Sequence, residues 1–242
     1  MSEHDKVLEL IRIKDQAPLT LDPGKVALLV IDVQRYFVSP DYPFAQAFEK
    51  LVPGATTGYF QRVNSTVLPN IKRLQDYFRS RKSPIIYTGT GTGTGDGQDL
   101  ALWLKDFDQL GLAVLGERIW PPISDSSWQI DDTIKPLQGE LVINKTSSGP
   151  LNSTRLDQTL HNLGIESLIV TGLTTDVCVS QTARETADRG FQVIVAEDAC
   201  TTLSEEMHRG ALQCFQIAFG RVRKTDEILA LLTSANVSAV GV

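Results

Sequence analysis

Cysteine and histidine are scarce in this 242-residue chain, which contains three of each. The three cysteines, Cys178, Cys200 and Cys214, are too few for the disulfide framework of a secreted protein. The first residues, MSEHDKVLELIRIKDQ, are charged throughout and lack the apolar core of a signal peptide. No run approaches the ~20 apolar residues that cross a bilayer. We therefore expect a cytoplasmic protein.

Positive charge is also in short supply. The chain has 23 lysines and arginines against 29 aspartates and glutamates, which gives a net charge of −6. This balance offers no basic face for nucleic acid or for an anionic membrane. We expect a small molecule as the partner, with no nucleic acid and no membrane.

Short runs rich in valine and isoleucine are present along the chain, and each is typical of a strand buried on both faces. Helical patterns separate them, and the alternation predicts a three-layer, doubly wound α/β fold with a mostly parallel sheet of about six strands. We expect one domain over residues 1–242. The runs are residues 26–32, 84–88, 140–145, 167–172 and 191–198, with a weaker sixth at 220–225.

Two regions between these runs give local expectations. Residues 89–139 predict long loops with one short helix at most. The segment TRLDQTLHNLG predicts a helix with Asn152 and Ser153 as its cap and Gly164 as its stop.

Three reactive side chains fall where predicted strands end, which is where parallel sheets bind ligands. Asp32 closes the first run, Lys145 closes LVINK, and Cys178 follows SLIVTG by a few residues. Taken singly, the aspartate is typical of a turn cap, the lysine of a solvated end and the cysteine of a small buried hydrophobe. Their coincidence at one edge favours a site, while the pattern alone leaves both interpretations open.

The segments around these residues resemble the isochorismatase-like cysteine hydrolases over roughly residues 25–229. ALLVIDVQRYF is similar to the family's first strand, with its catalytic aspartate and the pocket aromatic that follows. VINKTSSGPLNSTRLDQTL is similar to the lysine-bearing strand and the loop beyond it. VTGLTTDVCVSQTARETADRGFQVIVAEDA is similar to the Gly-x-x-Thr-x-x-Cys-Val segment that carries the nucleophile.

The resemblance implies a cysteine-dependent amidohydrolase that cleaves a C–N bond of a small linear amide, carbamoyl or ureido compound. Cys178 is then the nucleophile that forms a thioester, with its pKa lowered by a helix N-terminus and by Lys145. Asp32 carries the proton. The resemblance places the oxyanion hole on the backbone N–H groups of Thr174 and Cys178, beside a cis peptide bond between Leu173 and Thr174.

Further site residues follow from the same resemblance. Phe37, Thr175 and Leu151 are expected to contact the substrate. Many family members have Ser-x-Phe where this chain has Gly149, Pro150 and Leu151, so an aromatic pocket wall is either missing or supplied elsewhere. A homodimer or homotetramer is also implied.

No metal and no cofactor are expected. Nicotinamidases of this superfamily bind a divalent metal through Asp-x-His and a further histidine, and His4, His161 and His208 do not form that arrangement. The glycine-rich stretch GTGTGTGDG lacks the spacing of a phosphate loop and favours a lid or a pocket wall.

Several questions stay open at this point. Alternatives to the amidohydrolase are a non-catalytic binding member of the same fold, and a lactam-hydrolysing or isochorismatase-type hydrolase. We expect Cys200 and Cys214 to be buried structural thiols. Trp103, Trp120 and Trp128 are each compatible with a core, an interface or a pocket wall.

Overall fold

The computed structural model describes residues 1–239 of the chain. At its centre lies a six-stranded sheet with all strands parallel, in the order β3-β2-β1-β4-β5-β6. Each of the six predicted runs forms one of these strands, and the predicted doubly wound α/β fold is confirmed. The strands are β1 (Val26–Ile31), β2 (Ile85–Thr90), β3 (Leu141–Lys145), β4 (Ser167–Leu173), β5 (Gln192–Thr201) and β6 (Arg221–Arg223).

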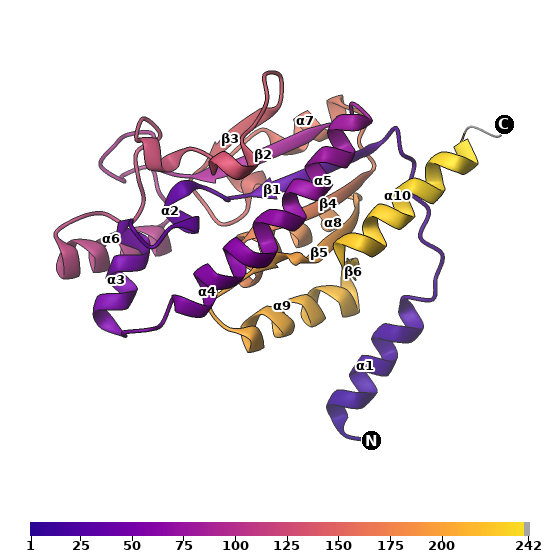
Figure 1. The fold of residues 1–242 in the computed structure, drawn as a ribbon, viewed down its shortest axis with the longest axis horizontal. Helices are drawn as coiled ribbons and strands as arrows, with labels where there is room; N and C mark the ends of the chain where they lie inside the picture. Colours follow the sequence, from indigo (N-terminus) through magenta and orange to yellow (C-terminus); the bar gives the residue numbers. More distant parts are fainter. Residues whose placement is uncertain (240–242) are drawn as a thin grey trace.

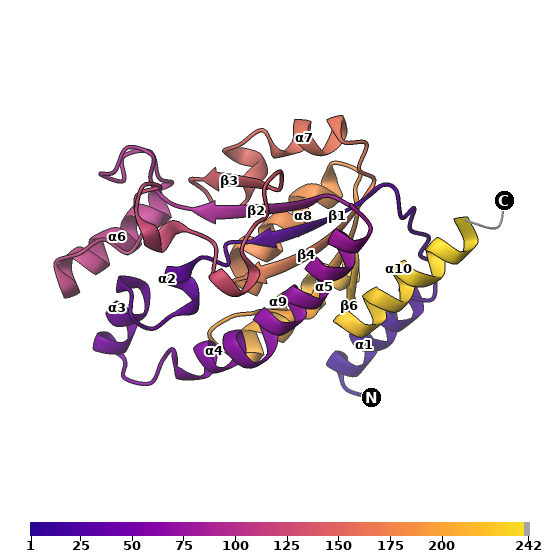
Figure 2. The ribbon, with the colours of Figure 1, turned by 45° about the horizontal axis from the view of Figure 1, so that its top comes forward.

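Helices pack against both faces of the sheet and complete three layers (Figures 1 and 2). One face is covered by α5 (Leu68–Ser80) and α10 (Thr225–Ala239). The other face is covered by α7 (Leu156–Asn162), α8 (Ser180–Asp188) and α9 (Glu205–Ala218). Because apolar helices lie on both sides, the central strands need hydrophobic residues at every position.

Strand β1 shows this requirement directly. Leu28 and Val30 belong to the core under α5, whereas Ala27, Leu29 and Ile31 belong to the core under α8. All six residues of β1 are buried. The unbroken apolar run that predicted a strand is therefore the result of alternate residues packing into two separate cores.

The remaining helices lie at the two ends of the sheet. In Figure 1, α1 and both termini lie at the right, while α2, α3 and α6 lie at the left. These helices are α1 (Glu3–Lys14), α2 (Arg35–Val38), α3 (Pro43–Leu51), α4 (Thr57–Arg62) and α6 (Leu102–Leu115), with a π-helical turn at Val63–Val67 and 3-10 turns at Ser126–Trp128, Asp132–Ile134 and Pro150–Asn152.

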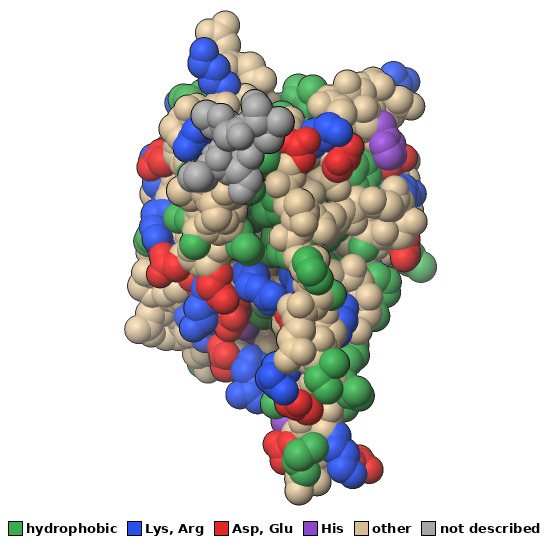
Figure 3. All heavy atoms as spheres, turned by 90° about the vertical axis from the view of Figure 1, so that its right-hand side faces the viewer, with side chains coloured by type: hydrophobic (Ala, Val, Ile, Leu, Met, Phe, Trp, Pro, Cys, Tyr) green, Lys and Arg blue, Asp and Glu red, His purple; other side chains and the backbone are tan. Residues whose placement is uncertain are grey.

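On the face shown in Figure 3, acidic and basic side chains are intermixed rather than gathered into one field.

Helix α6 is longer than the sequence predicted for residues 89–139, because it has 14 residues rather than a short turn. Its neighbours explain its length. Gly111 lies so close to the following chain that a Cβ there would come within 2.7 Å of the Glu117 carbonyl oxygen. Asp108 accepts the backbone N–H groups of Ile119 and Trp120, both at 3.0 Å. The returning chain thus folds back on the helix and stabilises it.

The predicted cap of α7 is wrong. The helix begins at Leu156 with Arg155 before it, and Asn152 and Ser153 are used by the loop instead. Asn152 donates to the Glu185 carboxylate, and Ser153 Oγ accepts the Ser147 hydroxyl at 2.9 Å. Gly164 does follow the helix, at a left-handed φ of 66°.

The two cysteines outside the predicted site differ in exposure. Cys200 is buried, as predicted, but Cys214 is exposed on α9, so the expectation of a buried thiol is wrong for Cys214.

Among residues 1–239, no helix is both long and apolar enough to cross a membrane. The homo-oligomer implied by the resemblance stays a prediction.

Candidate active site

Three strands deliver the predicted reactive residues to one edge of the sheet. Because all strands are parallel, their carboxyl ends point the same way, toward α2, α3 and α6 (Figure 2). Asp32 directly follows β1, Lys145 ends β3, and Cys178 lies in the π-helical turn Thr175–Val179 after β4. Asp32 and Lys145 are fully buried, and Cys178 is 6% exposed. The structure therefore brings all three together.

An ion pair joins two of these residues, and the third lies beside it. Lys145 Nζ is 2.8 Å from Asp32 Oδ2 and 3.4 Å from Cys178 Sγ. The Lys145 ammonium also donates to the hydroxyl of Thr90 at 2.7 Å and to the carbonyl of Ser147 at 2.9 Å. An ammonium has three donors, and all of them are engaged in holding the cluster.

Two threonines of β2 complete the cluster, and sequence reasoning missed both. Thr88 Oγ1 donates to Asp32 Oδ1 at 2.8 Å, and Thr90 Oγ1 donates to Asp32 Oδ2 at 3.0 Å. They stand two residues apart on a strand, which places both hydroxyls on one face. Two hydroxyls at this spacing at the end of an apolar strand were the signal available in the sequence.

The backbone around Asp32 is arranged to bring the strands close. Asp32 has a φ of 52°, in the left-handed region that aspartate tolerates better than most side chains. Gly172 of β4 has a φ of 114°, and a Cβ there would lie 2.1 Å from the carbonyl oxygen of Ile31. Only glycine fits beside β1 at this point, one residue before the catalytic candidate.

The segment that carries Cys178 has an unusual peptide bond and is closed by hydrogen bonds within its own backbone. The peptide bond between Leu173 and Thr174 is cis, at the bond where the resemblance placed it. The Thr174 carbonyl accepts the N–H groups of Val177 and Val179, both at 3.2 Å. These bonds close the tight turn that carries Cys178 between its two ends.

Burial dominates the ionisation of the cysteine. Burial raises the pKa of the Cys178 thiol to about 12, the Lys145 charge opposes that rise, and the Asp32 carboxylate adds to it. The prediction of a lowered thiol pKa is therefore wrong, because loss of solvent outweighs the nearby ammonium. The thiol keeps its proton at neutral pH and needs a base to remove it.

The lysine, in contrast, stays charged. Burial lowers the pKa of Lys145, but the interactions of its ammonium with Asp32 and Cys178 outweigh burial and raise the pKa above its ordinary value. At neutral pH the Lys145 ammonium therefore lies against a neutral Cys178 thiol on one side and against Asp32 on the other.

The raised pKa of Cys178 gives a stability prediction with a definite sign. A cysteine in the unfolded chain ionises near its ordinary value of 9.0, while the folded thiol does so only at about 12. The contribution to stability is complete below the unfolded value and is lost as pH rises through this window. We expect the free energy of unfolding to fall more steeply across it for the wild type than for Cys178→Ala. Denaturant titrations at several pH values measure both slopes, and parallel slopes contradict the expectation.

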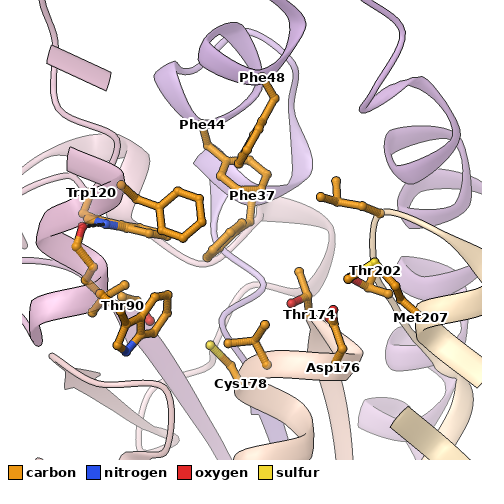
Figure 4. Close-up of a pocket in the computed structure, with 15 residues that line it drawn as sticks. Phe37, Phe44, Phe48, Thr90, Trp120, Thr174, Asp176, Cys178, Thr202 and Met207 are labelled. Carbon is orange, nitrogen blue, oxygen red and sulfur yellow. Dashed lines mark hydrogen bonds between the residues drawn. The ribbon is translucent and has the colours of Figure 1, made fainter. Parts of the chain in front are cut away.

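A cavity of about 200 Å³ opens above Cys178. Figure 4 shows the sulfur directed at the space below the rings of Phe37 and Phe44, with Trp120 to one side. Phe37 lines this cavity, as the resemblance implied. The lining residues are Phe37, Phe44, Phe48, Thr90, Trp103, Leu104, Phe107, Trp120, Thr174, Asp176, Val177, Cys178, Thr202, Leu203 and Met207.

Two of the expected substrate contacts lie away from the cavity. Thr175 is 1% exposed, and its hydroxyl is 2.8 Å from Nδ1 of His208 on α9. Burial lowers the pKa of His208, so the imidazole is held neutral in this contact. Leu151 packs in the core under α7 and α8. Neither Thr175 nor Leu151 is among the residues that line the space above the sulfur.

The aromatic wall comes instead from α3 and α6. Phe44 and Phe48 stand four residues apart on α3, and Trp103 and Phe107 stand four apart on α6. Their rings meet edge to face, with the centroids of Phe48 and Phe107 6.0 Å apart. Spacing of i, i+4 on a helix was the signal for these two pairs. The wall that seemed absent after Lys145 is thus supplied by other segments.

The tryptophans divide between two roles. Trp103 and Trp120 line the cavity. Trp128 belongs to the scaffold, because its indole Nε1 donates to Asn144 at 2.8 Å and a Cβ on Gly91 would lie 2.4 Å from its ring. Of the segment 89–97, only Thr90 lines the cavity, so the glycine-rich stretch is not its wall.

The glycine-rich stretch is held by hydrogen bonds to Asp99, which follows it in the chain. The Asp99 carboxylate accepts the Thr92 hydroxyl at 2.6 Å and the backbone N–H of Gly93 at 2.8 Å. Within residues 1–239, no cluster of three or more histidine, cysteine, aspartate or glutamate side chains is arranged to hold a metal ion.

The fold and the buried aspartate, lysine and cysteine describe an α/β protein with a thiol-centred site of the hydrolase type. The family model for the isochorismatase domain matches residues 26–227, and the chain belongs to the isochorismatase family. The resemblance predicted from the sequence is confirmed at this level.

Curated relatives are similar over most of the chain. The N-carbamoylsarcosine amidase of Arthrobacter sp. is 28% identical over 214 residues, which cover 86% of this chain and 72% of the relative. The ureidoacrylate amidohydrolase RutB of Methylobacterium radiotolerans is 27% identical over 212 residues, covering 85% and 78%. The predicted class, a hydrolase of carbon–nitrogen bonds outside peptides, is the class of these relatives.

Solved structures share the fold. A cysteine hydrolase from Pseudomonas syringae pv. phaseolicola superposes with a TM-score of 0.72 at 21% identity, covering 91% of this chain and 99% of that one. The N-carbamoylsarcosine amidase of Thermoplasma acidophilum superposes with a TM-score of 0.58 at 20% identity, covering 84% and 97%. The six-stranded parallel architecture is therefore that of the family.

Proposed function

We propose that this protein is a cysteine-dependent amidohydrolase that cleaves a C–N bond of a small amide, carbamoyl or ureido compound through a thioester. The observation that carries the proposal is the contact of Lys145 Nζ with both Asp32 and Cys178, at 2.8 and 3.4 Å, at the base of a cavity. The names of the curated relatives support the substrate class.

Acylation begins with a neutral thiol. Asp32 and Cys178 both contact the Lys145 ammonium, and in this proposal Asp32 takes the thiol proton as the Sγ–C bond forms to the substrate carbonyl. Lys145 keeps its charge and stabilises the anions on both sides. In this proposal the backbone N–H groups of Thr174 and Cys178 hold the oxyanion. Collapse of the tetrahedral intermediate breaks the C–N bond, and Asp32 returns the proton to the leaving amine.

Deacylation uses the same groups in reverse order. Asp32, now deprotonated, takes a proton from a water molecule that attacks the thioester carbonyl. The C–S bond breaks, and the proton returns to the Cys178 sulfur. The sum for a primary amide is R–CO–NH₂ + H₂O → R–COO⁻ + NH₄⁺. Lys145 keeps its place throughout, since Thr90 and Ser147 anchor it.

Release of ammonia from a panel of primary amides, ureas and N-carbamoyl compounds tests this proposal. The wild type should release ammonia from at least one class, and its acyl-enzyme should appear in the mass spectrum as an adduct on Cys178. An active protein whose Cys178→Ala variant turns over at the same rate refutes the mechanism.

We predict that activity survives exhaustive chelation. Asp32 is the obvious carboxylate at the site, and the Lys145 ammonium at 2.8 Å already occupies the position that a cation would need. Dialysis against EDTA, followed by the ammonia assay and metal analysis, measures this. Loss of activity that returns with stoichiometric zinc, manganese or iron contradicts it.

A further inference from the structure

The walls of the cavity above Cys178 are apolar, whereas the Asp32–Lys145 pair below the cysteine is charged. Ten of its lining residues are hydrophobic, and they come from four segments of the chain: Phe37, Phe44, Phe48, Trp103, Leu104, Phe107, Trp120, Val177, Leu203 and Met207. The rings pack against one another edge to face, with centroids 4.8 Å apart for Phe37 and Phe44 and 6.2 Å apart for Phe107 and Trp120. Only the two indole N–H groups among these side chains can donate a hydrogen bond, and that of Trp120 is already bonded to the Leu104 carbonyl at 2.7 Å.

Charge in the lining is of one sign. Among the described residues that line the cavity there is no lysine, arginine or histidine, while Asp176 contributes a carboxylate. Oδ1 of Asp176 is buried and has no hydrogen-bond partner among the described residues. Figure 4 shows Asp176 beside Thr174, on the same side of the cavity as Cys178. The Asp32–Lys145 pair beneath is neutral as a unit, so the space carries a net negative charge.

We propose, resting on the proposed function, that the substrate is an amide whose remaining group R is an uncharged alkyl or aryl group of about five or six carbons, and that carboxylate-bearing amides are rejected. An apolar cavity of about 150 Å³ holds a benzene ring, so the ~200 Å³ here takes a ring or a short alkyl chain. A carboxylate in the same place loses its water and meets Asp176 with no cation to pair with.

Three amides that differ only in R test the cavity: acetamide, hexanamide and adipic acid monoamide. Each buried CH₂ group adds about fourfold to kcat/KM, so hexanamide should exceed acetamide by roughly 200-fold. Adipic acid monoamide has the same chain with a terminal carboxylate and should fall below hexanamide by about 100-fold or more. Equal rates for hexanamide and either of the other two overturn the proposal.

A positive charge introduced at an exposed residue of the cavity lining shows whether the rejection of carboxylates arises in this cavity. Met207 lines the space from α9 and is 47% exposed, so Met207→Arg adds a guanidinium near Asp176 without emptying a core. This variant should raise kcat/KM for adipic acid monoamide about tenfold. Ile217→Arg is the matched control, because Ile217 is 38% exposed on the same helix and does not line the cavity. An equal gain in both variants overturns the proposal.

Protection of Cys178 from iodoacetamide separates this inference from the proposed function. If no amide is hydrolysed, the proposed function is wrong. Binding of the amides to the cavity can still be measured, because a bound amide shields Cys178 from alkylation. Hexanamide that slows alkylation of Cys178, with no effect of adipic acid monoamide, supports the inference. Equal protection by both compounds, or by neither, overturns it.

Discussion

Replacement of Cys178 by alanine is expected to lower amide turnover by at least about 10⁴-fold while leaving the protein folded. The thioester cannot form without the sulfur, and neither Asp32 nor Lys145 offers a substitute nucleophile once they are paired with each other. The side chain is small and buried, so its truncation removes little packing. Ammonia release and thermal unfolding of the same preparation measure both effects.

Cys200→Ala is the matched control for this experiment. Cys200 is also a free and buried thiol, but it belongs to β5 and does not line the cavity. It should keep wild-type turnover. Retention of more than a few per cent of activity by Cys178→Ala, on a substrate that the wild type hydrolyses, removes Cys178 from the role of nucleophile.

The sheet and the position of the reactive residues were open to prediction because they depend on simple rules. Buried parallel strands need hydrophobic residues on both faces, as Leu28 and Leu29 show by entering opposite cores. The carboxyl ends of parallel strands meet at one edge, so Asp32, Lys145 and Cys178 had to approach each other once the topology was known.

The cavity wall was not predictable in the same way. Phe48 and Phe107 lie about sixty positions apart in the chain, and their contact depends on how α3 and α6 pack together at the sheet edge. The segment that holds α6 has no strand pattern, and its sequence predicts long loops with at most one short helix rather than a helix of 14 residues. Leu151, chosen because it follows the lysine-bearing strand, packs under α7 because Pro150 starts a 3-10 turn that leads it into the core.

The ionisation of Cys178 also needed the structure. A helix N-terminus and a nearby ammonium both lower a thiol pKa, and both were visible in the sequence. Burial acts in the opposite direction, and its size depends on how parts of the chain distant in sequence surround the sulfur, which only the folded structure shows. In the proposed mechanism, the removal of the thiol proton is therefore the task of Asp32.

Substitution of Lys145 by methionine is expected to abolish turnover and to destabilise the protein by about 3–5 kcal/mol, since it leaves the fully buried Asp32 carboxylate without a counter-charge. Asp32→Asn should also abolish turnover, while Lys145 keeps its bonds to Thr90 and Ser147. Chemical denaturation at neutral pH and the ammonia assay measure the two properties independently.

The double variant Asp32→Asn/Lys145→Met distinguishes a structural ion pair from a catalytic one. With both charges removed, no buried charge is left unpaired, so the double variant should lose less stability than the two single losses added together, by about 1–3 kcal/mol. Activity should stay absent, because the proton carrier is gone. Lys25→Met is the control for the lysine change: its pair with Glu166 is 2.7 Å long but about half exposed, and such pairs contribute about 0–1 kcal/mol. Additive losses in the double variant, or measurable turnover in Lys145→Met, contradict the role assigned to this pair.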